Sequence, residues 1–394
     1  MKTKKIAYIL ILMLFFSTAS SVLAVEDNGN RYLVKSNSNF WKKSFTVRHN
    51  FDNGFTADLS DFQLRFAKIF GVELEPVKKV YILPAEQTEL SAPKKNVQKR
   101  IFPSEQVPWG VKSIYNESVL EKTNGGAGVN VAVLDTGVLK THPDIKNRIK
   151  ECKDFSNNRT PLIDGKCDDK NGHGTHVSGS IAADGGSDGQ GIYGIAPGAN
   201  LFAYKVCSDN GFCWADDIAI AIRAAAENGA NIINLSLGSD AESQLISDAV
   251  NFAVSKNVLI VAAAGNDGPY DGSIDYPAAK SSTVAVGAFN SVLEISEWSS
   301  RGINSLSEFY VVEDGDMEFA APGVSVESTW KDGGYAVLSG TSMAAPHVSG
   351  LAAKLWQKDA ENPASSTRDL LHWFSVDLQP SGDDNSSGWG FPRL

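Results

Sequence analysis

The sequence predicts an α/β protein in which a parallel sheet is covered by helices on both faces, preceded by a small α+β domain. From about residue 104, short apolar runs alternate with helical stretches, as in a parallel sheet buried between two helical layers. The preceding residues 25–100 mix strand-like and helix-like segments and can just sustain a fold of their own. The chain has 394 residues and 42% hydrophobic content, which is enough for two or three domains.

The first residues have the pattern of an export signal. Lys2, Lys4 and Lys5 precede an apolar stretch at 6–16, and Val-Leu-Ala at 22–24 is an acceptable cleavage triplet. We therefore expect residues 1–24 to be a signal peptide and the protein to be secreted, with an uncleaved membrane anchor as the alternative. No later stretch reaches 18 uninterrupted apolar residues, so no membrane association is expected after signal removal.

The expected elements follow from apolar periodicity and from turn residues. In the front part we expect strands at 31–34, 44–47 and 77–83, a helix at 59–70 and an exposed linker at 91–100. In the main part we expect strands at 129–134, 201–206, 232–237, 258–263 and 283–288. The helices expected in the main part span 173–183, 215–228, 240–256 and 341–357.

Charge is distributed unevenly between the two parts. Residues 1–100 contain 16 Lys and Arg against 9 Asp and Glu, and the whole chain contains 36 against 46. The acidic main part argues against non-specific binding to nucleic acid. A basic front part and an acidic main part are expected to attract each other.

The four cysteines, Cys152, Cys167, Cys207 and Cys213, all lie in the main part. In an oxidising compartment we expect local disulfides, Cys152 with Cys167 and Cys207 with Cys213. A zinc site is the alternative, although the chain has no C-x-x-C pair and no His in ligand spacing nearby. Free thiols are the third interpretation.

Residue types of a nucleophilic site occur at the expected ends of elements. Asp135 follows a strand, His173 begins a helix between two glycines, and Ser342 begins a helix of small residues. Ser is a weak nucleophile until a His accepts its proton, and the His needs an acid that fixes its tautomer. Asn266 follows another strand and can donate to a developing oxyanion. Taken singly, these residues also fit turns, a helix cap or a zinc pair with His176.

The motifs around these residues resemble those of the subtilisin-like serine proteases. They span 131–137, 172–179, 262–268 and 340–350, they occur in the family order, and the resemblance covers roughly residues 104–393. It implies a three-layer α/β/α sandwich with a parallel sheet of about seven strands. It also implies a serine endopeptidase that cleaves polypeptide substrates through an acyl-enzyme.

The resemblance assigns roles to single residues. Asp135, His173 and Ser342 would form the catalytic triad, and Asn266 would be the oxyanion donor. The order Asp, His, Ser differs from that of chymotrypsin-like enzymes and of α/β-hydrolases.

The front part also gains a role from the resemblance. Such enzymes carry an inhibitory chaperone propeptide that the enzyme itself removes, so we expect residues 25–103 to be the propeptide and 104–394 the catalytic domain. Residues 107–110, Val-Pro-Trp-Gly, look like the start of a mature subtilisin domain. Maturation cleavage is therefore expected between about Arg100 and Glu105, by the enzyme itself or by another protease acting after the basic pair. The mature enzyme is expected to be a monomer.

In this family a substrate peptide adds as a strand between two segments of the enzyme. The residues matched to this cleft are Ser236, Leu237 and Gly238 on one side, Gly211 and Phe212 on the other, and Ala263, Ala264 and Gly265 in the first specificity pocket. Asp275 aligns with the floor of that pocket, where a carboxylate would favour Lys or Arg substrates. A solvated loop acid is the other interpretation of Asp275 and the one that we favour.

A structural calcium ion is also implied by the resemblance, because carboxylate and carbonyl oxygens suit Ca²⁺. The expected ligands are Asp144, the loop 184–190 with Asp188, and Glu105. A further acidic group, Asp164, Asp168 and Asp169, is expected to be a solvated loop, with a second calcium site as the alternative.

The sequence departs from the family pattern in three places. Ala345 stands where the family usually has Thr or Ser, and an acidic stretch that ends at Glu318 replaces a shorter loop. The chain ends at residues 388–394, where the family normally continues into a last helix, so we expect a truncated product. Two other functions stay open: a catalytically silent relative that acts as a binding protein, and a processing protease that cleaves after basic pairs.

Overall fold

The computed structural model describes residues 30–83, 98–306 and 309–394. The expected signal peptide and most of the expected linker at 91–100 lie outside these residues. The chain divides into two compact units: the smaller contains the described residues up to Val47 together with Asp52–Pro76, and the larger contains Arg48–Phe51 and Val77–Leu394. None of the helices in the described ranges is long and apolar enough to cross a bilayer.

The small unit is α+β, as expected. Its sheet has the strands β1 (Arg31–Val34), β2 (Val47–Phe51), β3 (Gly54–Asp58) and β4 (Leu74–Pro76), in the order β2-β3-β1-β4. Of β2, only Val47 belongs to the small unit by compactness. Its helices are α2 (Asn39–Ser44) and α3 (Asp61–Ile69). Their apolar faces enclose a core of Val34, Phe45, Phe55, Ala57, Leu59 and Ala67.

Two expectations for the small unit are wrong. Residues 44–47 are not a strand of their own: Ser44 ends α2, whose N-terminus is capped by the Ser38 side chain, and Val47 begins β2. Residues 77–83 do not join the small sheet, because β5 (Lys79–Ile82) pairs with strands of the large unit.

The large unit is built on an eight-stranded sheet of order β16-β15-β14-β12-β7-β10-β8-β9. Seven strands are parallel, and only β9 pairs antiparallel with its neighbour, so the expected seven-stranded parallel sheet is confirmed. In chain order the strands are β7 (Asn130–Asp135), β8 (Ile149–Asp154), β9 (Ile163–Asp164), β10 (Asn200–Lys205), β12 (Ile232–Leu235), β14 (Leu259–Ala263), β15 (Val284–Phe289) and β16 (Phe319–Pro322). The run expected at 232–237 is interrupted, since β12 ends at Leu235 and β13 (Leu237–Gly238) belongs to another sheet.

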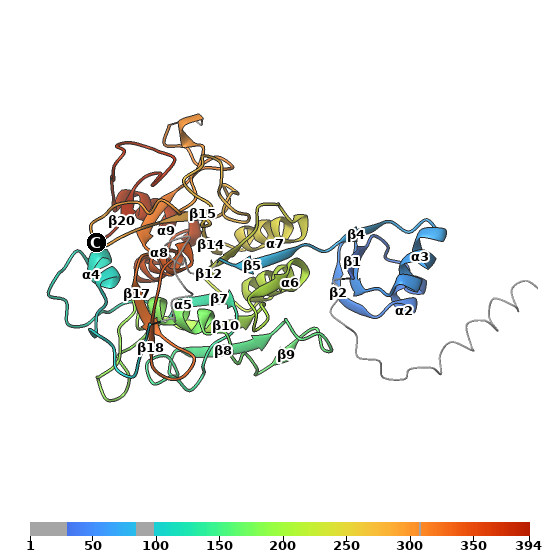
Figure 1. The fold of residues 1–394 in the computed structure, drawn as a ribbon, viewed down its shortest axis with the longest axis horizontal. Coiled ribbons are helices and arrows are strands. Elements are labelled where there is room, and N and C mark those ends of the chain that lie inside the picture. Colours follow the sequence, from blue (N-terminus) through green and yellow to red (C-terminus); the bar gives the residue numbers. More distant parts are fainter. Residues whose placement is uncertain (1–29, 84–97, 307–308) are drawn as a thin grey trace, which may run out of the picture. The chain divides into compact units, whose positions relative to one another are not determined.

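Alternating side chains of the sheet pack into two separate cores. Val131 and Val133 of β7 belong to one core, and Ala132 and Leu134 belong to the other. The first core includes α5 (His173–Ala182) and α8 (Thr341–Leu355), and the second includes α6 (Ala215–Glu227) and α7 (Gln244–Ser255). This arrangement, visible in Figure 1, is the three-layer sandwich that the sequence predicted.

Shorter elements surround the sandwich. They are β6 (Gln98–Arg100), α4 (Trp109–Tyr115), β11 (Phe212–Trp214), a 3₁₀ turn (Asn304–Leu306), β17 (Val326–Thr329), β18 (Tyr335–Leu338), α9 (Pro363–Trp373), β19 (Ser375–Val376) and β20 (Phe391–Pro392). Strand β6 corrects the linker prediction, because it pairs antiparallel with β18 and Arg100 forms an ion pair with Glu327. Both expected disulfides are confirmed, Cys152–Cys167 and Cys207–Cys213.

Candidate active site

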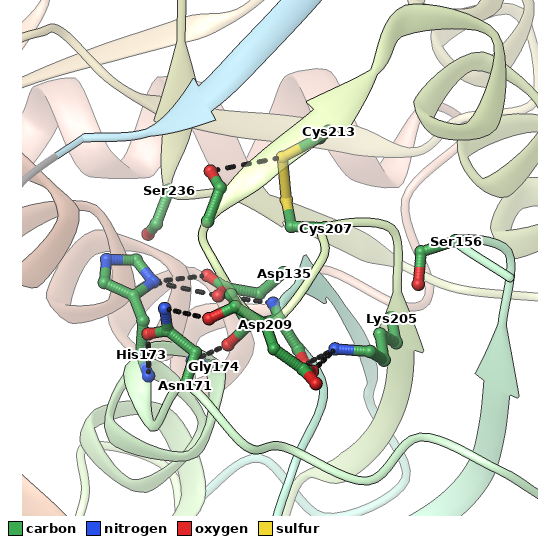
Figure 2. The surroundings of a disulfide bond; sticks show 12 residues. Asp135, Ser156, Asn171, His173, Gly174, Lys205, Cys207, Asp209, Cys213 and Ser236 are labelled. Carbon is green, nitrogen blue, oxygen red and sulfur yellow. Dashed lines mark hydrogen bonds and ion pairs between the residues drawn. A yellow bond between two sulfur atoms is a disulfide. The ribbon is translucent and has the colours of Figure 1, made fainter. Parts of the chain in front are cut away.

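Asp135 and His173 meet at the carboxyl edge of the main sheet. Asp135 is the last residue of β7 and His173 the first of α5, and His173 Nδ1 lies 2.8 and 2.9 Å from the two carboxylate oxygens. Figure 2 shows the two side chains facing each other near the Cys207–Cys213 disulfide. Ligands of parallel α/β sheets bind at this edge, so the pair lies where a reaction centre is expected.

A glycine allows the two elements to approach closely. A Cβ atom on Gly174 would lie 2.2 Å from the Gly137 carbonyl oxygen and 3.1 Å from Asp135 Oδ1. Any larger residue at position 174 would therefore push the first turn of α5 away from the end of β7.

The pKa of His173 is raised above its ordinary value. Burial lowers it, but the charge of Asp135, the hydrogen bond to Asp135 and the charge of Asp169 together outweigh burial. An imidazole held in this way readily accepts a proton and keeps Nδ1 paired with the carboxylate. Its other nitrogen, Nε2, is buried and has no hydrogen-bond partner among the described residues.

Asp169 is a positioning residue that the sequence analysis missed. Instead of lying in a solvated loop it is buried, and its carboxylate accepts hydrogen bonds from Thr136 Oγ1 at 2.9 Å and from Gly172 N at 2.7 Å. It also accepts from Thr175 Oγ1 at 2.6 Å. Asp169 thus ties the turn after Asp135 to the start of α5. Nothing in its local sequence, Cys-Asp-Asp-Lys, distinguishes it from an exposed acidic turn.

Ser342 is buried at the start of α8. Its Oγ donates to Ser236 O at 3.1 Å and, more weakly, to Leu83 O at 3.4 Å. No hydrogen bond joins Ser342 to His173 in the part of the chain that the structure describes. The hydroxyl is therefore directed at the carbonyl of a neighbouring chain segment, and the triad role of Ser342 stays a prediction.

Asn266 follows β14 and faces the start of α8. Its side-chain oxygen accepts from Thr341 N and from Thr341 Oγ1, both at 3.0 Å. These bonds fix which end of the amide is the oxygen, so the NH₂ end points away from Thr341. The role of Asn266 as an oxyanion donor stays a prediction.

The predicted cleft residues border a strand of the chain itself. Strand β5 lies between β11 and β13 and is antiparallel to both. Tyr81 is paired with Phe212 and Gly238, and Ile82 N donates to Gly211 O at 2.9 Å. Leu83 follows directly, with its carbonyl at Ser342. The segment 77–83 therefore lies as a strand between the two segments that were predicted to border the cleft.

Asp275 lies beside two of the predicted cleft residues. It is 3% exposed, and a Cβ atom on Gly238 or on Gly265 would lie 2.8 or 2.9 Å from its Oδ2. The favoured interpretation of Asp275 as a solvated loop acid is therefore wrong, because the side chain is buried. Ala263, the last residue of β14, and Ala264 are both buried and precede Gly265.

The expected calcium ligands are brought together only in part. Asp144 is buried, and its Oδ2 accepts from Ile192 N at 2.8 Å and from Tyr335 OH at 2.9 Å, whereas Oδ1 has no partner among the described residues. A Cβ atom on Gly186 would contact both Asp144 Oδ1, at 2.9 Å, and Asp188 Oδ1, at 3.3 Å. An unsatisfied buried carboxylate oxygen next to a second carboxylate fits a calcium ion.

Glu105 is not part of this group of ligands. Its carboxylate forms an ion pair with Lys112. The next residue, Gln106, contacts the loop 184–190 instead, by a hydrogen bond from its side-chain amide to Gly189 O.

Comparison with known proteins identifies the class. The model of the subtilase family matches residues 126–390 of this chain. The fold agrees with that match, and the chain belongs to the subtilase family of serine proteases. It is a subtilisin-type serine endopeptidase.

Individual relatives cover most of the chain. It is 44% identical over 375 residues to a subtilisin of Bacillus sp. (strain TA39), covering 90% of this chain and 87% of that protein. It is 34% identical to M-protease of Shouchella clausii (strain KSM-K16), covering 98% and 93%. Among solved structures, the S41 psychrophilic protease is 48% identical and Sphericase 50% identical, each with a TM-score of 0.71, covering 74% of this chain and 99% of the other.

Proposed function

We propose that this protein is made as a secreted proenzyme and hydrolyses polypeptide substrates through Asp135, His173 and Ser342. The observation that carries the proposal is the carbonyl of Leu83, which accepts a hydrogen bond from Ser342 while the preceding strand is paired on both sides. A substrate bound in this way presents its carbonyl to the hydroxyl oxygen that would attack it.

The first half of the reaction forms an acyl-enzyme. Ser342 Oγ attacks the carbonyl carbon, and its proton moves to His173 Nε2, the ring nitrogen opposite the one that Asp135 holds. The charge on the carbonyl oxygen is stabilised by the NH₂ group of Asn266 and by the N-terminus of α8. The carbon–nitrogen bond then breaks, and the His173 imidazolium gives the proton to the leaving amine.

The second half reverses these roles with water. Water enters the place of the amine, gives a proton to His173 and attacks the ester carbon of the acylated Ser342. Breaking the ester bond returns the proton to Ser342 and releases the carboxylic acid product. Since each half needs an imidazole that is neutral before the attack, activity should increase as His173 loses its proton.

The front part is proposed to be an inhibitory propeptide. Residues 77–83 fill the cleft in the manner of a substrate, so no other peptide can pair there while they stay bound. The solved structures support removal of a front segment. The matched region includes 99% of each of those chains but only 74% of this one. The proposed partners are polypeptide substrates and the protein's own propeptide, and no nucleic acid is expected to bind. The mature enzyme is proposed to be a monomer.

Maturation cleavage is proposed to fall between about Arg100 and Glu105. The bond that follows Leu83 is a Leu–Pro bond, and the ring of Pro84 makes its nitrogen a tertiary amide with a restricted backbone, so residues 77–83 suit an inhibitor better than a substrate that is cleaved at that bond. Sequencing of the amino terminus of the matured enzyme tests the position of the cleavage. A mature terminus outside 100–105 would contradict it.

A calcium ion is proposed to stabilise the mature fold. Asp144 and Asp188 would hold it together with oxygens of the loop 184–190, and the ion would neutralise the buried carboxylate of Asp144 and the exposed one of Asp188. An ion that binds the folded state alone raises stability and takes no part in the chemical step.

A fluorophosphonate, which reacts covalently with an activated serine, tests the proposed function. We expect labelling of the matured wild-type enzyme and no labelling of Ser342→Ala. Replacement of Ser349, another buried serine of α8, by Ala serves as the matched control and should keep its label. A folded wild-type protein that does not react would support the alternative of a catalytically silent binding protein.

A further inference from the structure

An arginine side chain is held by acceptors of the large unit outside the cleft. Arg48 belongs to the large unit by compactness, and its Nε and Nη2 donate to the two carboxylate oxygens of Asp217, at 2.8 and 2.9 Å. Nη2 also donates to Phe155 O at 2.8 Å, and Nη1 donates to Asn157 O at 2.9 Å. His49 Nε2 lies 2.8 Å from the same carboxylate. Arg48 and Asp217 are both buried, so the guanidinium is enclosed by these groups.

The acceptors match the shape of a guanidinium. This group is planar and presents five N–H donors in a fixed fork, and the carboxylate of Asp217 accepts two of them side by side. The main-chain carbonyls of Phe155 and Asn157 accept from two more positions on the same fork. A lysine ammonium carries its charge at one point and would satisfy only part of this set. We call Asp217 together with these two carbonyls the arginine site.

The two carbonyls are fixed by the large unit itself. They lie in the turn after β8, in which Asp154 Oδ1 accepts from Ser156 N and from Ser156 Oγ, both at 2.8 Å. Asn157 Oδ1 accepts from Arg159 N at 2.9 Å and from Thr160 N at 3.0 Å. None of these four bonds involves the front part of the chain. The turn should therefore keep its shape when the front part is removed.

A surface hollow joins the arginine site to the border of the cleft. Asn157 and Asp217 line this hollow together with Trp214, the last residue of β11. Trp214 is paired with Lys79 of β5, which precedes Leu83 in the strand that lies along the cleft. A substrate strand that pairs as β5 does would therefore approach the arginine site with residues on the amino-terminal side of the cleaved bond.

We infer that the mature enzyme binds an arginine side chain of its polypeptide substrates at Asp217, outside the cleft and on the amino-terminal side of the cleaved bond. The inference rests on the proposed function, because Arg48 leaves this place only when the front part is removed. Removal opens the four hydrogen-bonding positions that Arg48 fills, and an arginine of another polypeptide can fill them in the same way. In the precursor, Arg48 keeps such a substrate out of the arginine site.

Equilibrium binding to the matured enzyme, labelled at Ser342 with the fluorophosphonate, tests the site itself. The probes are N-acetyl-arginine amide and N-acetyl-lysine amide, which carry the same charge. We expect the arginine probe to bind about 10-fold more tightly than the lysine probe, and Asp217→Asn to lose about 10-fold or more of the affinity for arginine. Glu227→Gln is the matched control, because it removes the same charge from an exposed position at the other end of α6, and it should leave the affinity unchanged.

Digestion of a protein substrate by the unlabelled enzyme tests what the site is for. Conversion of the substrate's arginines to citrulline removes their charge and leaves its lysines as they are. The ratio of KM for the citrulline form to KM for the unmodified form should be higher in wild type than in Asp217→Asn, with little change in kcat. If Asp217→Asn does not fold, the arginine probe replaces it: the probe should raise the wild-type KM for the unmodified protein and not for the citrulline form.

The outcomes separate the inference from the proposed function. A labelled enzyme that does not prefer the arginine probe, or that binds it equally well as Asp217→Asn, overturns the inference. Probe binding without any effect of citrulline, Asp217→Asn or the probe on KM would assign the site to the front part alone, and this also overturns the inference. If the front part is not removed and Ser342 is not labelled, the proposed function has failed instead.

Discussion

Replacing Asp135 by Asn is the most direct perturbation of the proposed reaction centre. The carboxylate lies 2.8 Å from His173 Nδ1, and its Oδ1 also accepts from Thr136 N at 2.6 Å. An Asn side chain fills the same space but can present its NH₂ group to Nδ1. That contact would place the ring proton on Nε2, where His173 could no longer accept a proton from Ser342.

The size of the effect follows from the distance. Two unit charges 2.8 Å apart interact with about 6 kcal/mol at an effective dielectric constant of 20. This energy stabilises the imidazolium that forms in the transition state, and about 1.36 kcal/mol corresponds to a factor of ten in rate. We therefore expect kcat/KM to fall by about 10⁴-fold in Asp135→Asn, the loss found for the same replacement in a Ser-His-Asp protease of another fold.

The pH profile gives a second, independent readout. The wild-type acidic limb should lie above the ordinary His value of 6.5, because Asp135 and Asp169 raise the pKa of His173 against the effect of burial. Without the charge of Asp135, burial dominates, so the limb should move to lower pH. A merely misfolded variant would lose activity without such a shift.

The assay measures the rate constant for fluorophosphonate labelling of Ser342 against pH, together with kcat/KM on a peptide anilide. Because the variant is not expected to mature itself, it is processed by added wild-type enzyme and then purified. The labelled species is identified by its mass, which excludes traces of wild type. A loss of less than about 10-fold, or an acidic limb that stays in place or moves upward, would refute the reasoning.

Three further predictions concern stability. EDTA should lower the Tm of the mature wild-type enzyme by several degrees, because calcium at 100 times its Kd adds about 2.7 kcal/mol to the free energy of unfolding. In a thermal melt, Asp144→Asn should lose most of this response to EDTA. Glu318 is fully buried and forms an ion pair with Arg368 at 2.6 Å. Glu318→Gln should therefore lower the free energy of unfolding, measured in guanidinium, by about 3–5 kcal/mol. A loss below about 1 kcal/mol would contradict a stabilising role of this buried ion pair. Burial raises the pKa of Asp275 to about 7, so the folded state binds its proton more tightly than the unfolded state does, and stability falls as the pH rises from about 4 to 7. At pH 9, Asp275→Asn should be more stable than wild type by at most about 4 kcal/mol, and this gain should shrink toward pH 4.

Local sequence predicted the central strands and helices because their patterns are determined by complete burial. The strands β7, β12 and β14 are continuous apolar runs between turn residues, and burial on both faces of the sheet requires such runs. Strand β8 was missed for the opposite reason. Its sequence, Ile-Lys-Glu-Cys-Lys-Asp, is polar because the strand lies near the edge of the sheet and is only half-buried.

The reaction centre was predictable as far as chemistry restricts residue types. Asp135 and His173 each stand at an element end that parallel topology brings to one edge, and their motifs carried the resemblance. Asp169 could not be found in this way, because its role depends on tertiary hydrogen bonds that its neighbours in sequence do not reveal. The pairing of 77–83 with strands more than 100 residues away was likewise invisible to local patterns.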